Sequence, residues 1–156
     1  MKITIICIGK THASYLREGI GIYLDRLKHY AKVEVIELSD VTSKGITSDL
    51  AKQKEGELIL KSLKSDDGLF LLDEKGDHYS SRQFADFLQK KMNAGLKNLV
   101  LVIGGAFGFS DEVYKRASGK ISFSKMTFSH EMIRLLLVEQ LYRGLTILKG
   151  ESYHHD

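Results

Sequence analysis

The sequence has one cysteine, no long apolar run and no cluster of residues with metal-ligand spacing. Cys7 therefore has no partner for an intramolecular disulfide, and its place in the apolar run at residues 3–8 predicts a buried thiol. No apolar stretch approaches the roughly 20 residues that cross a bilayer, and Met1-Lys2 leads directly into this strand-like run instead of a signal peptide. We therefore expect a cytoplasmic protein, neither inserted in a membrane nor secreted, that holds no metal ion.

The length and net charge of the chain bear on its number of domains and on the kind of partner it binds. The 156 residues suit one domain, residues 1–156, which would bury roughly 70% of the surface of its unfolded chain. There is no internal repeat, low-complexity run or linker, and the least regular stretch, residues 39–47, is short enough to be a loop. The net charge of +3 and the isoelectric point near 8.9 favour an anionic partner only mildly, because nucleic-acid-binding domains typically exceed about 9. Charge alone does not identify the partner.

Short β-branched runs alternate with longer amphipathic segments along the chain. The predicted strands are residues 3–8, 33–38, 69–73, 99–103 and 121–123. The predicted helices begin near Ser14, Ser48, Ser81, Ser110 and His130. The Ser14 hydroxyl can cap the first helix, and Asn93-Ala94-Gly95 is typical of a left-handed C-cap. The alternation predicts an α/β fold with a mostly parallel sheet and helices on both faces.

The second predicted helix, residues 48–64, mixes apolar and charged side chains. Those predicted to face the core are Leu50, Leu58, Ile59 and Leu63. Those predicted to face solvent are Lys52, Lys54, Glu55 and Glu57. Such a mixture of charges is most simply a solvated helix face.

The last predicted helix, residues 130–148, is apolar around most of its circumference. Such a helix must be buried on nearly every side, whereas the outer side of a helix in a two-layer domain faces water. Apolar patches of this size usually mark interfaces, so we expect a second copy of the chain to cover it in a homodimer. The alternative is that the carboxyl-terminal tail and the first helix cover it within one chain.

Two loops in the last third of the chain are candidates for a binding site. The strand at 99–103 ends in Gly104-Gly105-Ala106-Phe107-Gly108, and the strand at 121–123 ends in alternating small polar and large apolar residues before Ser129 caps the last helix. Loops at the carboxyl ends of parallel strands form the crevice where α/β proteins bind nucleotide-like ligands, and glycine allows close approach. A third loop after Leu71-Leu72-Asp73 would complete the wall. Taken singly, each loop also fits an ordinary strand-to-helix turn.

Polar residues of the last helix and the tail form a second group of candidates. His130 and Arg134 share one helix face, as do Glu139 and Arg143, because residues four apart are neighbours on a helix. A histidine near a helix start is often only a cap partner, and Glu139-Arg143 is also typical of a structural ion pair. For the tail Tyr153-His154, the alternative is a frayed terminus.

Several motifs occur in a characteristic order along the whole chain. They are Lys2-Ile3-Thr4-Ile5 with Gly9-Lys10, Lys54-Glu55-Gly56-Glu57, Ile103-Gly104-Gly105, residues 123–128, Glu139-Gln140-Leu141-Tyr142-Arg143 and Tyr153-His154. Through them the chain resembles the RlmH family, SPOUT-class methyltransferases of the large ribosomal subunit. The resemblance implies a homodimer that uses S-adenosylmethionine to methylate N3 of pseudouridine 1915 in helix 69 of 23S rRNA, on assembled 70S ribosomes. It also implies that the cofactor-binding part, about residues 99–156, contains a trefoil knot, which general topology rules would reject.

The resemblance and the chemistry of the reaction also suggest which residues act. Those implied to contact S-adenosylmethionine are Leu72, Gly104, Phe123, Ser124, Lys125, Met126, Thr127 and Phe128. We assign Arg143 as the cation that stabilises the deprotonated base or clamps a phosphate. Tyr153 and His154 are assigned to hold the base near the other subunit's cofactor, and His154 is also a candidate general base.

Two positions depart from the family pattern. Ser129 stands where the family usually has proline, which should matter little because serine is a good helix cap. His155 stands where a basic residue commonly follows the Tyr-His pair, and histidine is only partly charged near neutral pH. A phosphate contact from the tail is therefore expected to be weaker.

Two other functions remain as alternatives. A related SPOUT activity would methylate a tRNA base or a ribose 2′-hydroxyl instead of 23S rRNA. A non-enzymatic protein that retains the fold would bind ribosomes without binding S-adenosylmethionine, and the intact cofactor loops argue against it.

Overall fold

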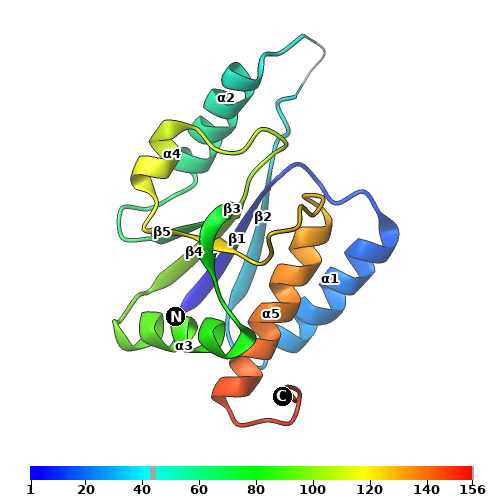
Figure 1. Cartoon of the computed structure of the whole chain (residues 1–156), viewed down its shortest axis with the longest axis vertical. Helices are drawn as coiled ribbons and strands as arrows, with labels where there is room; N and C mark the ends of the chain where they lie inside the picture. Colours follow the sequence, from blue (N-terminus) through cyan, green and yellow to red (C-terminus); the bar gives the residue numbers. More distant parts are fainter. Residues whose placement is uncertain (43–44, 156) are drawn as a thin grey trace.

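The computed structural model describes residues 1–42 and 45–155, in which strands and helices alternate along the chain (Figure 1). The strands are β1 (Lys2–Ile8), β2 (Val33–Leu38), β3 (Gly68–His78), β4 (Asn98–Ile103) and β5 (Gly119–Ser122). The helices are α1 (Ser14–Leu27), α2 (Ser48–Lys61), α3 (Ser81–Asn93), α4 (Asp111–Arg116) and α5 (Met132–Leu148). Residues 43, 44 and 156, which belong to the predicted loop at 39–47 and the predicted tail, lie outside the described residues.

The strands form a parallel sheet in the order β2-β1-β4-β3-β5. This confirms the predicted α/β fold, and every strand pair of the described sheet is parallel. Leu72 of β3 lies opposite both Ile103 of β4 and Ile121 of β5. The carboxyl ends of these three strands therefore lie side by side, and the segments that follow them meet at one edge of the sheet.

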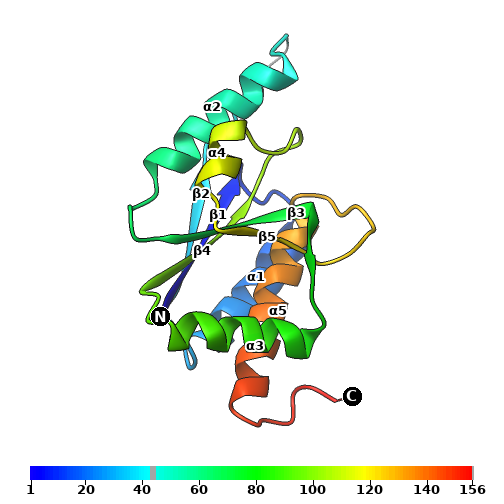
Figure 2. The ribbon, with the colours of Figure 1, turned by 60° about the vertical axis from the view of Figure 1, so that its left-hand side comes forward.

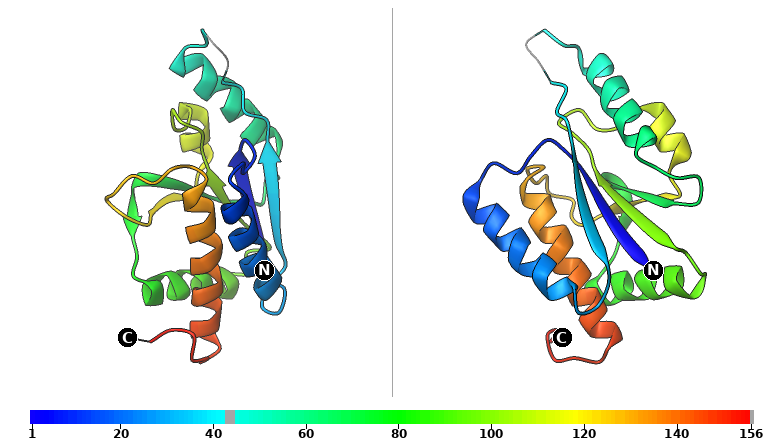
Figure 3. Two further views of the ribbon diagram at one scale, coloured as in Figure 1. Left: turned by 90° about the vertical axis from the view of Figure 1, so that its right-hand side faces the viewer. Right: turned by 180° about the vertical axis from the view of Figure 1, so that it is seen from behind.

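The two faces of the sheet carry different helices, as predicted. Alternate residues of a strand point to opposite faces, so Ile3, Ile5 and Cys7 join one core while Ile6 and Ile8 join the other. The first core includes side chains of α1, α3 and α5, and the second includes side chains of α2 and α4. Figure 2 and Figure 3 show α2 and α4 together, away from the group formed by α1, α3 and α5.

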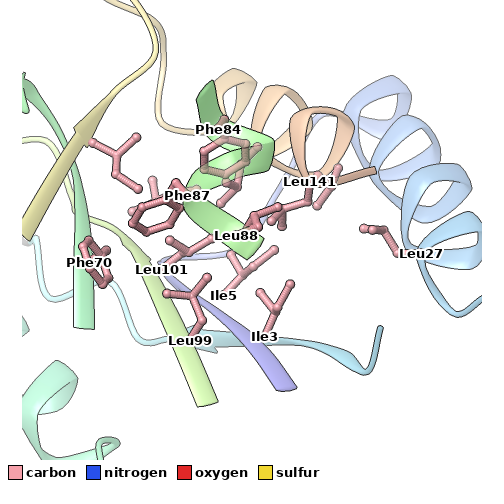
Figure 4. Close-up of a cluster of buried hydrophobic side chains, with 14 of the residues drawn as sticks. Ile3, Ile5, Leu27, Phe70, Phe84, Phe87, Leu88, Leu99, Leu101 and Leu141 are labelled. Atoms are coloured by element: carbon pink, nitrogen blue, oxygen red, sulfur yellow. The ribbon is translucent and has the colours of Figure 1, made fainter. Parts of the chain in front are cut away.

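The larger core packs aromatic and aliphatic side chains of α3 and α5 onto the strands (Figure 4). Phe84 and Leu88 of α3 and Leu141 of α5 lie over Ile5 and Leu101 of the sheet. Cys7 belongs to the same core and is buried, which confirms the predicted thiol environment. Burial raises the pKa of this thiol to about 11, so it stays protonated and unreactive near neutral pH.

Helix α5 lies between α1 and α3, which contact it from either side. Its apolar side chains are buried or half-buried, and none of them is exposed among the described residues. The tail and α1 thus cover much of α5 within one chain, as in the alternative considered above, and the homodimer stays a prediction. No helix of the described ranges is long and apolar enough to span a membrane.

Strand β3 differs from the prediction. The strand does not end at residue 73, and the segment after Leu71-Leu72-Asp73 is part of the strand instead of the predicted loop. The chain continues in β3 to His78, past an irregularity between Leu72 and Asp77, and pairs with β5 on both sides of it. A Cβ atom at Gly76 would come within 2.6 Å of the Ile121 backbone nitrogen, so only glycine lets the two strands approach this closely.

Helix α2 follows the predicted inward and outward sides only in part. Ile59 is buried and Glu57 is exposed, as predicted. Leu50 is 42% exposed, whereas Glu55, predicted to face solvent, is only 2% exposed. The buried residues of the helix are Ala51, Glu55, Gly56 and Ile59. Two of these four residues, Ala51 and Gly56, are small and allow close approach of the neighbouring segments.

Helix ends follow the predictions in part. Gly95 has a φ of 72°, which confirms the left-handed cap of α3, and the Ser110 hydroxyl accepts a hydrogen bond from the backbone of α4. Ser14 does not cap α1, because the N-cap position is Ala13, which makes no side-chain cap hydrogen bond. The Glu131 side chain accepts hydrogen bonds from the backbone N–H groups of His12 and Ala13, each at 3.1 Å.

Candidate functional site

A cavity of about 580 Å³ opens at the carboxyl ends of β3, β4 and β5. This volume lies in the range of roughly 300–1,000 Å³ that small-molecule sites occupy. Its lining comes from residues 72–75, residues 103–109, residues 121–124, residues 126–130, Tyr114 and Ile133. The structure thus brings together the two loops that were predicted to form a binding crevice. Residues 72–75 complete the wall, as predicted, although they belong to strand β3.

The glycine-rich loop after β4 forms a tight turn along one wall of the cavity. The Gly108 N–H donates to the Gly105 carbonyl at 3.2 Å, and Gly108 has a φ of 80°, a conformation that favours glycine. A Cβ atom at Gly104 would lie 3.0 Å from the Phe109 ring, so the backbone here packs closely on an aromatic side chain. The glycines of this loop leave backbone groups uncovered along this wall, beside the side chains of Phe107 and Phe109.

The segment after β5 forms a second turn that is held by serine side chains. The Ser122 hydroxyl donates to the Ser124 carbonyl at 3.1 Å, and the Ser124 hydroxyl accepts from the Met126 N–H at 2.8 Å. Met126 is 76% exposed at the cavity, and Phe128 beside it is also exposed. Ser129 accepts a hydrogen bond from the Met132 N–H, as expected for a cap at the start of α5.

Seven of the eight residues predicted to contact the cofactor line this cavity. They are Leu72, Gly104, Phe123, Ser124, Met126, Thr127 and Phe128. Lys125 is exposed and is not part of the lining.

Tyr114 joins the cavity from α4 and was not among the predicted residues. Its hydroxyl donates to the Asp73 carboxylate at 2.5 Å, which links α4 to the wall formed by β3. Burial, together with this hydrogen bond and the Asp73 charge, raises the pKa of Tyr114 to about 12. The phenol therefore stays neutral and keeps its proton in the bond. Nothing in the short helix at 111–116 distinguishes Tyr114 by periodicity.

Arg143, Tyr153 and His154 form a second cluster around the Glu139 carboxylate. One oxygen of Glu139 accepts from Arg143 Nε at 3.0 Å, from Arg143 Nη2 at 2.6 Å and from the Tyr153 hydroxyl at 3.1 Å. Arg143 Nη1 also lies 3.3 Å from His154 Nδ1, and the guanidinium sits 4.6 Å above the Tyr153 ring. The three predicted catalytic residues are thus brought together, and the tail is not frayed at this point.

Charge and burial set the protonation of Arg143 and Tyr153. The hydrogen bond with Glu139 raises the pKa of Arg143, which stays charged. Burial raises the pKa of Tyr153, and the Tyr23 hydroxyl at 3.1 Å and the Glu139 charge raise it further, so this phenol stays neutral. Arginine has no acceptor atom, so it must donate to His154 Nδ1, and the neutral ring then carries its proton on Nε2.

Tyr23 of α1 is a further member of this cluster and was not among the predicted site residues. Its ring packs on Tyr142 at 6.0 Å between centroids, and Tyr142 packs in turn on Tyr153 at 4.7 Å. The contact between the Tyr23 and Tyr153 hydroxyls joins residues 130 positions apart. No spacing pattern in the sequence could have suggested it.

The cavity and the Arg143 cluster lie at opposite ends of α5. Ile133 lines the cavity, and Arg143 follows ten residues later on the same helix, which corresponds to roughly 15 Å along the helix axis. Figure 1 shows the segment before α5 at one end of this helix and the carboxyl terminus beyond the other end. Arg143, Tyr153 and His154 are absent from the lining of the cavity among the described residues.

Arg134, which was predicted to share a helix face with His130, is a buried structural residue. It is 4% exposed and donates to the Thr11 hydroxyl at 2.9 Å and to the Ile8 carbonyl at 2.6 Å. Together with Glu131 it fixes the start of α5 to the segment after β1. His130 lines the cavity instead of sharing these contacts. Within residues 1–42 and 45–155, no three histidine, cysteine or acidic side chains are grouped as metal ligands would be.

Comparisons with known proteins identify the family of this chain. A family described as "Predicted SPOUT methyltransferase" matches residues 1–154. The chain is 54% identical over 156 residues to the ribosomal RNA large subunit methyltransferase H of Christiangramia forsetii, and the match covers 99% of each chain. It is 54% identical over 157 residues to the protein of the same name from Parabacteroides distasonis, with 100% of each chain covered.

A solved structure also shares the fold. A probable methylase family protein from Haemophilus influenzae Rd KW20 has a TM-score of 0.52 and 16% identity, covering 99% of this chain and 70% of that chain. At this identity the likeness concerns the fold alone. The family match over nearly the whole length and the close relatives decide the assignment: the chain belongs to the RlmH family of SPOUT methyltransferases.

Proposed function

We propose that this chain transfers a methyl group from S-adenosylmethionine to N3 of the pseudouridine in helix 69 of 23S rRNA, on assembled 70S ribosomes. The observation that carries the proposal is the identity of about half of all residues, over the full length, with methyltransferases named for large-subunit ribosomal RNA. The residues of the cavity and of the Arg143 cluster support it, because each group suits one half of this reaction.

The cavity residues fit S-adenosylmethionine. The close-packed backbone at Gly104 leaves main-chain groups to meet the flat polar edge of an adenine, and Phe123, Met126 and Phe128 offer apolar contacts. Asp73 at the rim supplies a negative charge, which suits a ligand with a positively charged sulfur. Leu72, Gly104 and the segment at 123–128 would hold the cofactor, with Lys125 outside the lining.

The Arg143 cluster suits the deprotonation of an imide base. When bound, S-adenosylmethionine supplies an electrophilic methyl group, and the base can accept it only after its N3 proton has left to solvent. The guanidinium of Arg143, held by Glu139, is placed to stabilise the resulting negative charge or a nearby phosphate. With Nδ1 accepting from Arg143, the neutral tautomer of His154 has its N–H on Nε2, which suits donation of a hydrogen bond to the base.

A homodimer is part of this proposal, because one chain does not bring the two groups of residues together. Reacting atoms must approach to about 3–3.5 Å, whereas the cavity and the cluster are separated by roughly 15 Å along α5. A second copy, oriented so that its cluster faces this cavity, would complete the site. The half-buried apolar side chains of α5 offer a surface for such a partner. The trefoil knot implied by the family resemblance also belongs to this proposal.

The test is transfer of labelled methyl from S-adenosylmethionine to pseudouridine-containing 70S ribosomes, followed by mass mapping of the labelled nucleotide. Label at N3 of the helix 69 pseudouridine is the expected result. Label on a tRNA base or on a ribose 2′-hydroxyl would replace the proposed substrate by another RNA within the same class of enzyme. Ribosome binding without cofactor binding would instead point to a non-enzymatic protein.

A further inference from the structure

Glu55 is a buried acid that the proposed reaction does not use. It lies in the middle of α2, on the side that packs against the rest of the protein, and is 2% exposed. Neither of its carboxylate oxygens has a hydrogen-bond partner among the described residues. Burial of such a group is costly, and buried polar groups without a partner are rare. Its place in the fold therefore calls for an explanation.

The carboxyl group of Glu55 lies directly against the glycine-rich loop of the cavity. A Cβ atom at Gly105 would come within 2.6 Å of Glu55 Oε2 and 2.8 Å of Oε1. Gly105 does not have a positive φ, so its backbone conformation alone would accept another residue. The space taken by Glu55 is what requires glycine at this position. Gly105 lines the cavity, whereas Glu55 lies behind it and does not.

Gly56, the next residue of α2, contacts the other end of the same loop. A Cβ atom there would collide with the Ser110 hydroxyl and would lie 3.3 Å from a methyl group of Val113. Ser110 caps α4, so it marks the point where the loop ends and the helix begins. Figure 1 and Figure 2 show α2 and α4 side by side. Helix α2 thus supports the loop at Gly105 and again at Ser110.

We propose that Glu55 is a positioning residue for the cofactor loop, acting through the Gly105 backbone. Its carboxyl group packs directly behind the Gly105 backbone, close to the Gly105 N–H, and this packing sets the orientation of the peptide groups that face the cavity. The Gly105 N–H already lies near enough to lower the Glu55 pKa, although burial and the charge of Asp40 raise that pKa more strongly. The identity of the ligand as S-adenosylmethionine rests on the function proposed above.

Four variants separate this role from general support of the core. Glu55→Gln keeps the size and one acceptor oxygen, Glu55→Asp withdraws the carboxyl group by one methylene, and Glu55→Ala removes it. Glu57→Ala, an exposed acid of the same helix and the same motif, is the matched control. For each purified chain we would measure S-adenosylmethionine binding by titration calorimetry, thermal unfolding, and hydrogen exchange of the Gly105 amide.

We expect Glu55→Ala and Glu55→Asp to weaken S-adenosylmethionine binding by about tenfold, and Glu55→Gln and Glu57→Ala to change it by less than about threefold. The Gly105 amide should exchange about tenfold faster in Glu55→Ala and at the wild-type rate in Glu55→Gln. If Glu55→Ala does not fold, Glu55→Asp and Glu55→Gln decide the question between them.

The possible failures are distinguishable. Unchanged cofactor affinity and unchanged Gly105 exchange in Glu55→Asp and Glu55→Ala would overturn the positioning role. Equal losses in Glu55→Gln and Glu55→Ala, in parallel with a lower unfolding temperature, would also overturn it and leave Glu55 as a structural residue. If the wild-type chain does not bind S-adenosylmethionine, the proposed function fails, and the exchange of the Gly105 amide still tests whether Glu55 positions the loop.

Discussion

Two variants of this chain, each inactive alone, are expected to restore activity when they assemble with one another. Thr127→Trp would fill the cavity from an exposed position without disturbing the core, and Arg143→Ala would disable the cluster at the other end of α5. Because the two sites lie roughly 15 Å apart along that helix, we infer that each active centre combines the cavity of one chain with the cluster of the other. A mixed dimer then contains one intact centre, built from the unaltered half of each chain.

The size of the recovery follows from counting these centres. Random assembly of equal amounts yields mixed dimers as about half of the total, and each has one of two centres intact, so the sample should reach about one quarter of the wild-type rate. Co-expression of two differently tagged chains, native mass spectrometry of the assembled dimers and labelled methyl transfer to 70S ribosomes measure this directly. If mixed dimers form and the rate stays at the level of the single variants, each chain must build its own centre and the reasoning is refuted.

Three further predictions concern single residues. Glu139→Ala should lower the free energy of unfolding, measured in urea, by roughly 2 kcal/mol, because half-buried Arg143 loses its partner. The same variant should reduce methyl transfer while cofactor affinity stays within about twofold. A stability equal to that of the wild type would contradict this prediction. Tyr114→Phe removes the hydrogen bond to the Asp73 carboxylate and should weaken S-adenosylmethionine binding by about threefold to tenfold in calorimetry, with Lys115→Ala on the same helix as the control. The pKa of Glu131 is lowered by the two backbone N–H groups before α1, so its stabilising effect should be full above the unfolded pKa of about 4.3 and be lost as pH falls through the folded value. Thermal unfolding from pH 3 to 7 should show this loss in the wild type and a smaller one in Glu131→Gln.

Most of the fold could be predicted because the local patterns agree with the tertiary structure. In β1 the alternation of Ile3, Ile5 and Cys7 with Ile6 and Ile8 feeds two cores, one on each face of the sheet. A strand buried on both sides has the continuous apolar sequence from which it was predicted. For the same reason, the sequence correctly predicted that the glycine-rich loop and the segment after β5 lie at one edge of the sheet.

The prediction failed where a single long-range contact overrides the local pattern. Asp73-Glu74-Lys75-Gly76 has the composition of a turn, yet it continues β3 because Gly76 allows close approach to Ile121. The charged run around Glu55 has the composition of a solvated face, and which of its four charges turns inward depends on a loop some fifty residues later. The following Gly56 was the available signal, since glycine inside a helix costs about 1 kcal/mol relative to alanine and usually has a packing reason.

The contacts that hold the tail also bear on how the two sites could meet. A single chain could complete its own centre only if Tyr153 and His154 left α5 and reached back along its length. That movement would break the hydrogen bonds of Tyr153 with Glu139 and Tyr23 and separate its ring from Tyr142. At the other end, the buried contacts of Arg134 fix the start of α5 and hence the cavity. With both ends of a rigid helix held in this way, docking of a second copy preserves every one of these contacts, whereas refolding of the tail breaks several of them. The energetic comparison therefore favours a centre shared between two chains.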